Sequence, residues 1–99
     1  MRLKNKVAII TGSSKGIGEG IARVFVQEGA KVVIVCRTES AGVKMADELG
    51  AKEGKAIFIQ TDLTKSEAIQ NLINKTVEAF GKIDILVNNA GYHISKKII

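Results

Sequence analysis

The stretch Thr11-Gly12-Ser13-Ser14-Lys15-Gly16-Ile17-Gly18 decides the fold of this 99-residue chain. It follows the apolar run Val7–Ile10 and precedes a segment with helical spacing from Glu19 to Glu28. A strand, a glycine-rich turn and a helix in this order direct backbone N–H groups and the positive end of a helix dipole toward one point, which favours a bound anion. We therefore predict a phosphate-binding loop at this position.

Each glycine of this loop has its own expected role. We expect Gly12 to permit the tight turn after the strand, Gly16 to let a pyrophosphate approach the backbone, and Gly18 to let the helix lie close to the sheet. The spacing Gly-x-x-x-Gly-x-Gly differs from the commonest dinucleotide fingerprint and from the nucleoside-triphosphate loop. Glycines also collect in turns that bind nothing. Whether this loop binds a phosphate must therefore be judged from the strand and helix around it.

The rest of the chain alternates between strand-like and helix-like segments. This alternation predicts an α/β fold with a parallel sheet of four strands, a class that binds ligands beyond the carboxyl ends of its strands. A Thr64-x-x-Glu67 capping box is expected to start the last helix, which Gly81 ends. The expected strands are 7–10, 31–36, 56–60 and 83–87, and the expected helices are 19–28, 39–49 and one that runs to Phe80.

Apolar residues at helical spacing predict which face of each helix packs on the sheet. The same spacing has a purely structural explanation, a hydrophobic core, and we adopt it. The predicted stripes are Ile17, Ile21, Val24 and Phe25 in the first helix, Val43, Ala46 and Leu49 in the second, and Ile69, Leu72, Ile73, Val77 and Phe80 in the third.

Composition limits the possible function. Basic residues outnumber acidic ones by 15 to 10, but they are scattered, so the surplus does not indicate a nucleic-acid partner. Cys36 is the only cysteine, which leaves no internal disulfide or zinc site and is typical of the cytoplasm. The sequence has neither an apolar signal core nor a run long enough to span a membrane.

Three signals lie at the ends of expected strands: the glycine loop, Asp62-Leu63 and Asn88-Asn89-Ala90-Gly91. Together they resemble the amino-terminal half of the short-chain dehydrogenase/reductase family, and the resemblance covers essentially the whole chain. It implies a partial Rossmann fold with strand order 3-2-1-4, ending after the fourth strand. In that order the glycine loop and residues 88–91 flank one crevice at the topological switch point.

The resemblance implies a bound nicotinamide dinucleotide. The pyrophosphate would lie on the loop, Asp62 and Leu63 along the adenine, and Asn89, Ala90 and Gly91 beside the ribose and nicotinamide. Asp62 could instead form an Asx turn before the helix, and the double asparagine could brace the sheet. The expected cofactor contacts are Gly12, Ser14, Lys15, Gly16, Ile17, Gly18, Arg37, Asp62, Leu63, Asn89, Ala90 and Gly91.

Charge after the second strand distinguishes the two forms of the cofactor. An acid there would accept the ribose 2′-hydroxyl of NAD, whereas a cation would pair with the 2′-phosphate of NADP. The sequence has Arg37 at this position and Lys15 inside the loop. We therefore predict NADP(H) as the preferred form, with NAD possible. The alternative is that both cations simply face solvent.

Catalytic residues are not expected in this chain. The resembled family transfers hydride with a Tyr-x-x-x-Lys pair and a serine that should lie well beyond Gly91. Tyr92-His93-Ile94-Ser95-Lys96 fits that spacing by coincidence, because it follows Gly91 directly instead of lying on a later helix. His93 has no partner at metal-ligand spacing, so no metal site is expected.

Two functional classes follow from these observations. The first is a short-chain oxidoreductase that interconverts a ketone and an alcohol, of which this chain is the cofactor-binding part. The second is a non-catalytic module that binds a dinucleotide or pairs with a partner through its open sheet edge. An exposed fourth strand and uncovered apolar side chains would make the fragment marginal alone. We therefore expect it either to be the amino-terminal part of a longer enzyme or to associate with other chains, for example as a homo-oligomer.

Overall fold

A parallel four-stranded sheet forms the centre of the computed structural model, which describes residues 2–12 and 16–88. The strand order is β3-β2-β1-β4, and all three strand pairs are parallel. This confirms the predicted α/β class and the order 3-2-1-4 of a Rossmann-like fold. In chain order the elements are β1 (Val7–Thr11), α1 (Gly16–Gln27), β2 (Lys31–Cys36), α2 (Glu39–Glu48), a short 3₁₀ helix η1 (Ala51–Glu53), β3 (Ala56–Gln60), α3 (Ser66–Phe80) and β4 (Ile85–Asn88).

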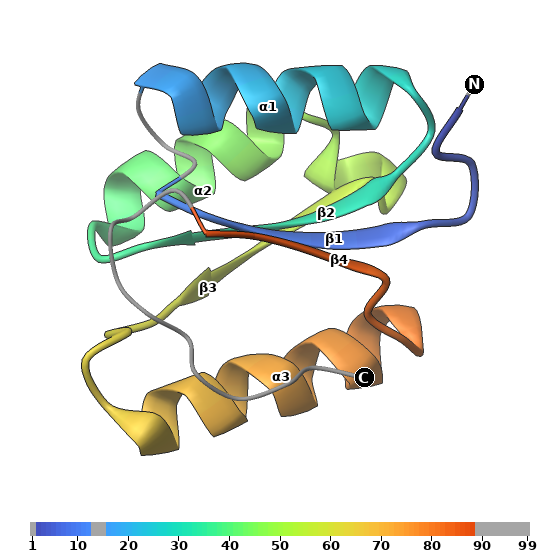
Figure 1. Cartoon of the computed structure of the whole chain (residues 1–99). Coiled ribbons are helices and arrows are strands. Elements are labelled where there is room, and N and C mark those ends of the chain that lie inside the picture. The colour runs from blue at the N-terminus through green and yellow to red at the C-terminus, as the bar shows by residue number, and fades with distance from the viewer. Residues whose placement is uncertain (1, 13–15, 89–99) are drawn as a thin grey trace.

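The helices lie on both faces of the sheet, with α1 and α2 on one side and α3 on the other (Figure 1). Strand β1 is buried along its whole length and β2 along most of it, because each lies between two strands and beneath helices. Strand β4 is the last strand of the described sheet on its side, and Ile85, Leu86 and Val87 are only partly buried. The burial therefore falls from the middle of the sheet toward β4.

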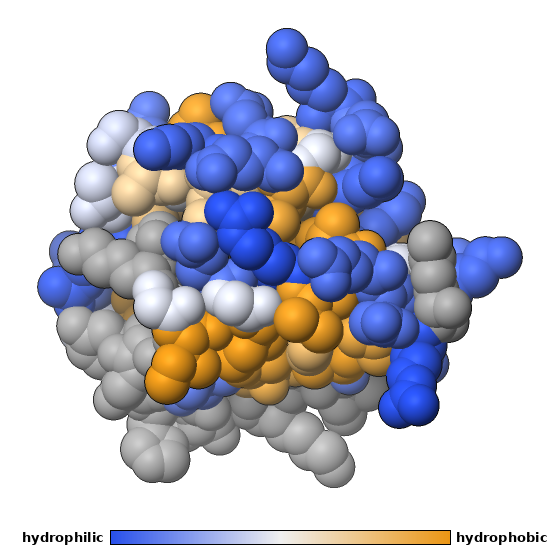
Figure 2. Space-filling view, turned by 90° about the horizontal axis from the view of Figure 1, so that it is seen from above, coloured by the Kyte–Doolittle hydropathy of each residue, from blue (hydrophilic) through white to orange (hydrophobic). Residues whose placement is uncertain are grey.

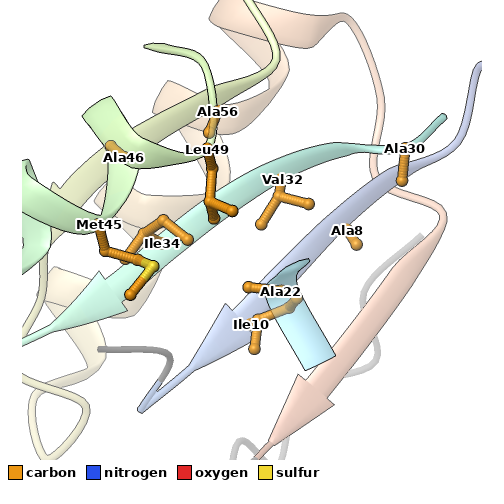
Figure 3. Packing of buried hydrophobic residues seen from close by; sticks show 10 residues of the cluster. All are labelled: Ala8, Ile10, Ala22, Ala30, Val32, Ile34, Met45, Ala46, Leu49 and Ala56. Atoms are coloured by element: carbon orange, nitrogen blue, oxygen red, sulfur yellow. The ribbon is translucent and has the colours of Figure 1, made fainter. Parts of the chain in front are cut away.

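The larger core lies between the sheet and helices α1 and α2 (Figure 3). Ala22 of α1 packs over Ile10, and the small alanine lets this helix approach the strand closely. Gly42 of α2 serves the same purpose over β3, since a Cβ there would collide with the ring of Phe58. The buried members are Ala8, Ile10, Ala22, Ala30, Val32, Ile34, Met45, Ala46, Leu49 and Ala56.

The second core lies between the sheet and α3. Leu72 is fully buried there, and Thr76 is buried beside it one turn later. The Thr76 hydroxyl donates a 2.8 Å hydrogen bond to the Leu72 carbonyl oxygen, so a polar side chain is accommodated in an apolar layer without an unpaired group. The buried apolar members are Ile9, Val33, Val35, Ile59, Leu63 and Leu72.

The predicted apolar stripes are only partly correct. Ile17 and Val24 of α1 are 75% and 53% exposed, and Val43 of α2 and Val77 of α3 are each 44% exposed. The buried face of α1 instead contains Gly18 and Ala22, because a helix that lies close to a sheet buries its small residues and leaves flanking large ones outside. Figure 2, which views the molecule from above with respect to Figure 1, shows hydrophobic surface among hydrophilic side chains.

Two helix starts differ from the prediction. Helix α1 begins at Gly16, inside the glycine loop and three residues before Glu19. Helix α3 begins at Ser66 with Lys65 as its N-cap, and no side chain caps it. The expected capping box is therefore wrong: the Thr64 hydroxyl donates to Asp62 instead.

Strand β4 begins at Ile85, two residues later than predicted, because Asp84 closes the sheet with its side chain. The carboxylate Oδ2 of Asp84 accepts a 2.8 Å hydrogen bond from the Val7 backbone N–H, and the Asp84 N–H donates to the Val7 carbonyl oxygen at 2.9 Å. The hydrogen bond from Val7, followed by the hydrogen bond and charge of Lys82, lowers the pKa of Asp84 below its ordinary value. Asp84 thus joins β1 to β4 at their amino ends.

Candidate nucleotide-binding site

The carboxyl ends of all four strands meet at one edge of the sheet. Thr11 at the end of β1 is in register with Val35 of β2 and with Asn88 of β4, and Cys36 of β2 is in register with Gln60 of β3. Segments that are far apart in the sequence therefore begin their loops side by side. This is the edge at which parallel α/β sheets bind their ligands, next to the point where the strand order reverses between β1 and β4.

The two glycines at the ends of the turn after β1 have left-handed backbone. Gly12 has φ of 64° and Gly16 has φ of 53°, a left-handed conformation that residues with a Cβ rarely adopt. The Gly12 N–H donates a 2.9 Å hydrogen bond to the Val35 carbonyl oxygen, which holds the start of the turn against β2. A Cβ at Gly16 would point into open space, while Gly18 is buried against the sheet.

Thr11 links the ends of β1 and β4 beneath this turn. Its side chain is fully buried, and its hydroxyl lies 3.3 Å from the Val87 carbonyl oxygen and 3.2 Å from Oδ1 of Asn88. This contact supports the sheet-bracing role for the first of the two asparagines. Thr11 was not among the predicted site residues, although a polar residue that ends an otherwise apolar buried strand is the signal that could have found it.

At the carboxyl ends of β2 and β3 the site is formed by side chains, in contrast to the glycine backbone that forms it after β1. The Arg37 Nη2 atom lies 3.7 Å from Asp62 Oδ1, and the Gln60 side-chain amide donates a 2.8 Å hydrogen bond to the Arg37 carbonyl oxygen. Arg37, Gln60, Thr61 and Asp62 line a shallow cleft of about 400 Å³. The cleft therefore contains one cation and one anion that face each other.

Asp62 also accepts two hydrogen bonds from Thr64. The Thr64 hydroxyl donates to Oδ1 at 2.6 Å and the Thr64 backbone N–H donates to the same oxygen at 3.0 Å, which is the geometry of an Asx turn. The hydroxyl contributes most to the lowered pKa of Asp62, followed by the Thr64 N–H, and the charge of Arg37 lowers it further. Asp62 is therefore ionised at neutral pH.

The other predicted contacts have different surroundings. Ile17 lies exposed in the first turn of α1, next to the glycine turn. Leu63 is buried in the core beneath α3, so only its backbone is available to a ligand at the cleft. Ser14, Lys15, Asn89, Ala90 and Gly91 lie outside the described residues, as do Tyr92, His93 and the rest of the Tyr-x-x-x-Lys stretch.

Neither a metal cluster nor a membrane-spanning helix is found in residues 2–12 and 16–88. No group of three or more His, Cys, Asp or Glu side chains in these ranges is arranged to hold a metal ion. Within the same part of the chain, every helix is too short or too polar to cross a membrane.

A Rossmann-like sheet with a glycine turn at its switch point defines the class of nucleotide-binding α/β proteins. Comparison with known families makes this more specific, because the family model of the short chain dehydrogenases matches residues 6–99. The chain therefore belongs to the short-chain dehydrogenase family, a family of oxidoreductases that bind a nicotinamide dinucleotide.

Individual relatives agree with this assignment. The chain is 42% identical over 92 residues to an L-fucose dehydrogenase of Bos taurus, a match that covers 93% of the chain and 33% of the relative. An uncharacterized oxidoreductase of Thermotoga maritima is 41% identical over 97% of the chain and 38% of its own length. A tropinone reductase-like protein of Erythroxylum coca is 46% identical over 91% of the chain and 32% of its own length. The chain thus spans about a third of the length of the curated relatives it matches.

Proposed function

We propose that this chain is the cofactor-binding part of an NADP(H)-dependent oxidoreductase that interconverts a ketone and an alcohol. The observation that carries the proposal is the glycine turn at the switch point, where Gly12 and Gly16 have left-handed backbone and open space lies beside Gly16. A phosphate can approach the N–H groups of such a turn at the start of α1, a helix of 12 residues.

The described residues fit a dinucleotide. The turn that contains Gly12, Gly16 and Gly18 would hold the pyrophosphate, and the cleft beside Asp62 would receive the adenosine half. Leu63 would contribute through its backbone. Ser14 and Lys15 would complete the phosphate site, and Asn89, Ala90 and Gly91 would lie beside the ribose and nicotinamide. The bound nicotinamide supplies the hydride acceptor or donor, whereas these residues bind and orient it.

The preference for NADP(H) rests on Arg37. Its side chain is 59% exposed directly after β2, where it can present several N–H donors to a 2′-phosphate. A guanidinium discriminates between the cofactors because NAD has only a neutral hydroxyl at that position. Lys15, in the glycine loop of the sequence, would add a second positive charge to the site.

The substrate lies in the class of small carbonyl compounds and alcohols. The names of two relatives, L-fucose dehydrogenase and tropinone reductase-like protein, describe such compounds for those proteins. A 3-oxoacyl thioester, a sugar or polyol, and a steroid or other ketone all remain candidates for the whole enzyme, because substrate specificity is determined outside the shared cofactor fold. The proposed location is the cytoplasm, which suits a single half-buried cysteine.

Binding of NADPH and NADH to the 99-residue chain tests the cofactor assignment. We expect NADPH to bind more tightly in a fluorescence titration at about 0.1 M salt. Arg37→Ala should weaken NADPH binding about tenfold or more and leave NADH binding unchanged, because it removes only charge-assisted hydrogen bonds to the 2′-phosphate. Lys44→Ala, on the exposed side of α2, is the control for a lost positive charge. Equal affinities that Arg37→Ala leaves unchanged would overturn the assignment.

A second candidate, a non-catalytic module that pairs with a partner, is favoured by the half-buried strand β4 and by the exposed Ile17 and Val24. Turnover of NADPH with a panel of ketones discriminates the two functions, provided that mass spectrometry verifies the chain. We expect the 99-residue chain to bind the cofactor without turnover. Turnover abolished by Tyr92→Phe would show instead that the chain is itself catalytic.

A further inference from the structure

Arg37 is restrained by two side chains of the neighbouring β3 segment. The Gln60 side-chain amide donates a 2.8 Å hydrogen bond to its carbonyl oxygen, which fixes the backbone immediately after β2. The Asp62 carboxylate lies 3.7 Å from the guanidinium nitrogen Nη2. The group that would recognise a 2′-phosphate thus has an anion beside it before any ligand arrives.

The position of that anion is itself fixed. Both hydrogen bonds from Thr64, at 2.6 and 3.0 Å, end on Asp62 Oδ1, the same oxygen that faces Arg37. A carboxylate anchored in this way cannot turn its charged oxygen away from the guanidinium without losing two hydrogen bonds. The chain therefore keeps a negative charge next to Arg37.

We propose that Asp62 is a specificity-determining residue that competes with the cofactor 2′-phosphate for Arg37. The proposal rests on the proposed function, in which Arg37 binds that phosphate. It assigns Asp62 the opposite effect: the carboxylate limits the preference for NADP(H) and leaves NAD(H) usable. Thr64 acts as its positioning residue, because it holds the carboxylate against the guanidinium.

The physical reason is the charge balance of the cleft. A 2′-phosphate must share a guanidinium that already faces a carboxylate, so it gains less attraction from Arg37 than it would if Asp62 were uncharged. The 2′-hydroxyl of NAD brings no charge, so Asp62 does not oppose it. The ion pair at 3.7 Å is longer than a charge-assisted hydrogen bond, and both side chains are partly exposed. We therefore expect the pair to orient Arg37 only weakly, so that the lost attraction outweighs any gain from a better-placed guanidinium.

The central experiment measures the ratio of NADH to NADPH dissociation constants in wild-type, Asp62→Asn, Arg37→Ala and doubly substituted chains. We expect Asp62→Asn to raise the preference for NADPH about threefold to tenfold. Any contact between Asp62 and the adenosine affects both dissociation constants equally, because both cofactors contain the adenosine, so it does not change the ratio. In the Arg37→Ala background the same substitution should change the ratio much less, because the competition requires Arg37.

Two further variants isolate the cause. Thr64→Val keeps the carboxylate but removes its hydroxyl anchor, so it should shift the ratio in the same direction as Asp62→Asn by a smaller factor. Asp47→Asn makes the same change in net charge at an exposed position of α2 that does not line the cleft, and it should leave the ratio unchanged. An equal shift in Asp47→Asn would assign the effect to net charge and overturn the proposal.

The possible failures are distinguishable. A preference for NADPH that depends on Arg37 but is unaffected by Asp62→Asn would overturn the competition and leave the proposed function intact. An equally large effect of Asp62→Asn with and without Arg37 would also overturn it. Failure to bind either nucleotide would overturn both proposals. Without any ligand, Arg37→Ala should raise the pKa of Asp62 in an NMR titration, and an unchanged pKa would overturn the pairing.

Discussion

The two halves of the candidate site are built in different ways. Beyond β1, the turn with Gly12 and Gly16 uses backbone conformation, and its expected ligand contacts are main-chain N–H groups. Beyond β2 and β3, the cleft uses the side chains of Arg37 and Asp62, together with the anchor of Thr64. A backbone site binds any phosphate of suitable shape, whereas a pair of opposite charges distinguishes one ligand from another. Under the proposed function, the first half would bind the cofactor and the second would select between its two forms.

The largest effect is expected at the backbone half. Gly12→Val should lower the free energy of unfolding by about 2 kcal/mol, because a left-handed φ of 64° is strained for residues with a Cβ and most of all for a β-branched one. Chemical denaturation measures this loss. Gly12→Asn should cost clearly less, since asparagine tolerates the left-handed region. Equal stability of Gly12→Val and the wild type would show that the turn does not require its glycine.

A second substitution tests ligand binding by the same half. Gly16→Ala should weaken NADPH and NADH equally, by about tenfold or about 1.4 kcal/mol, because a methyl group enters the space through which a phosphate approaches. Calorimetric titration measures both affinities. A change in only one of them would mean that this half also selects the cofactor, which would break the distinction between the two halves.

The matched control for Gly16→Ala is Gly20→Ala, one turn later in α1. Gly20 has helical backbone and open space where a Cβ would lie, so alanine there should stabilise the chain by about 0.5 to 1 kcal/mol without changing affinity. Both variants add one methyl group to the same helix. A loss of affinity in Gly16→Ala but not in Gly20→Ala would therefore be due to the position of Gly16 and not to the added methyl group as such.

The backbone half could be predicted from the sequence because glycine identity reports backbone conformation directly. Gly12 was expected to permit a tight turn and Gly16 to leave space for a pyrophosphate, and the structure shows positive φ at both and open space beside Gly16. The parallel sheet and its order were also predicted, the order through the family resemblance. The close approach of α1 at Gly18 was predicted as well, whereas the exposure of Ile17 and Val24 was not, because it depends on how the whole helix is rotated about its axis on the sheet.

The side-chain half was predicted less completely because it depends on register between strands. Arg37 and Asp62 were both selected as candidate contacts, but their contact follows from the pairing of Cys36 with Gln60, which no local pattern specifies. The assignment of Thr64 to a capping box failed for a related reason. Its hydroxyl had two possible partners, the start of α3 and the carboxylate of Asp62, and the turn geometry favours Asp62.

The smallest effect is expected in the side-chain half, as a pH dependence of stability. The pKa of Asp62 is lowered in the folded chain from its ordinary 3.8, mainly by the Thr64 hydroxyl, so the ionised form is favoured by folding. The resulting stability is fully present above the unfolded-state pKa and is lost as pH falls through the lower folded-state value. Thr64→Val should therefore be slightly less stable than the wild type at pH 6, and the difference should shrink below about pH 4.

Denaturant titrations of the wild type and Thr64→Val between pH 2 and pH 7 measure this convergence. Thr38→Val is the control, because Thr38 is also an exposed threonine just before a helix but its side chain caps nothing. Its effect on stability should be independent of pH over the same range. A difference between Thr64→Val and the wild type that stays constant or grows in acid would mean that the hydroxyl does not hold the Asp62 carboxylate. The side-chain half would then lose the anchor that keeps its negative charge beside Arg37.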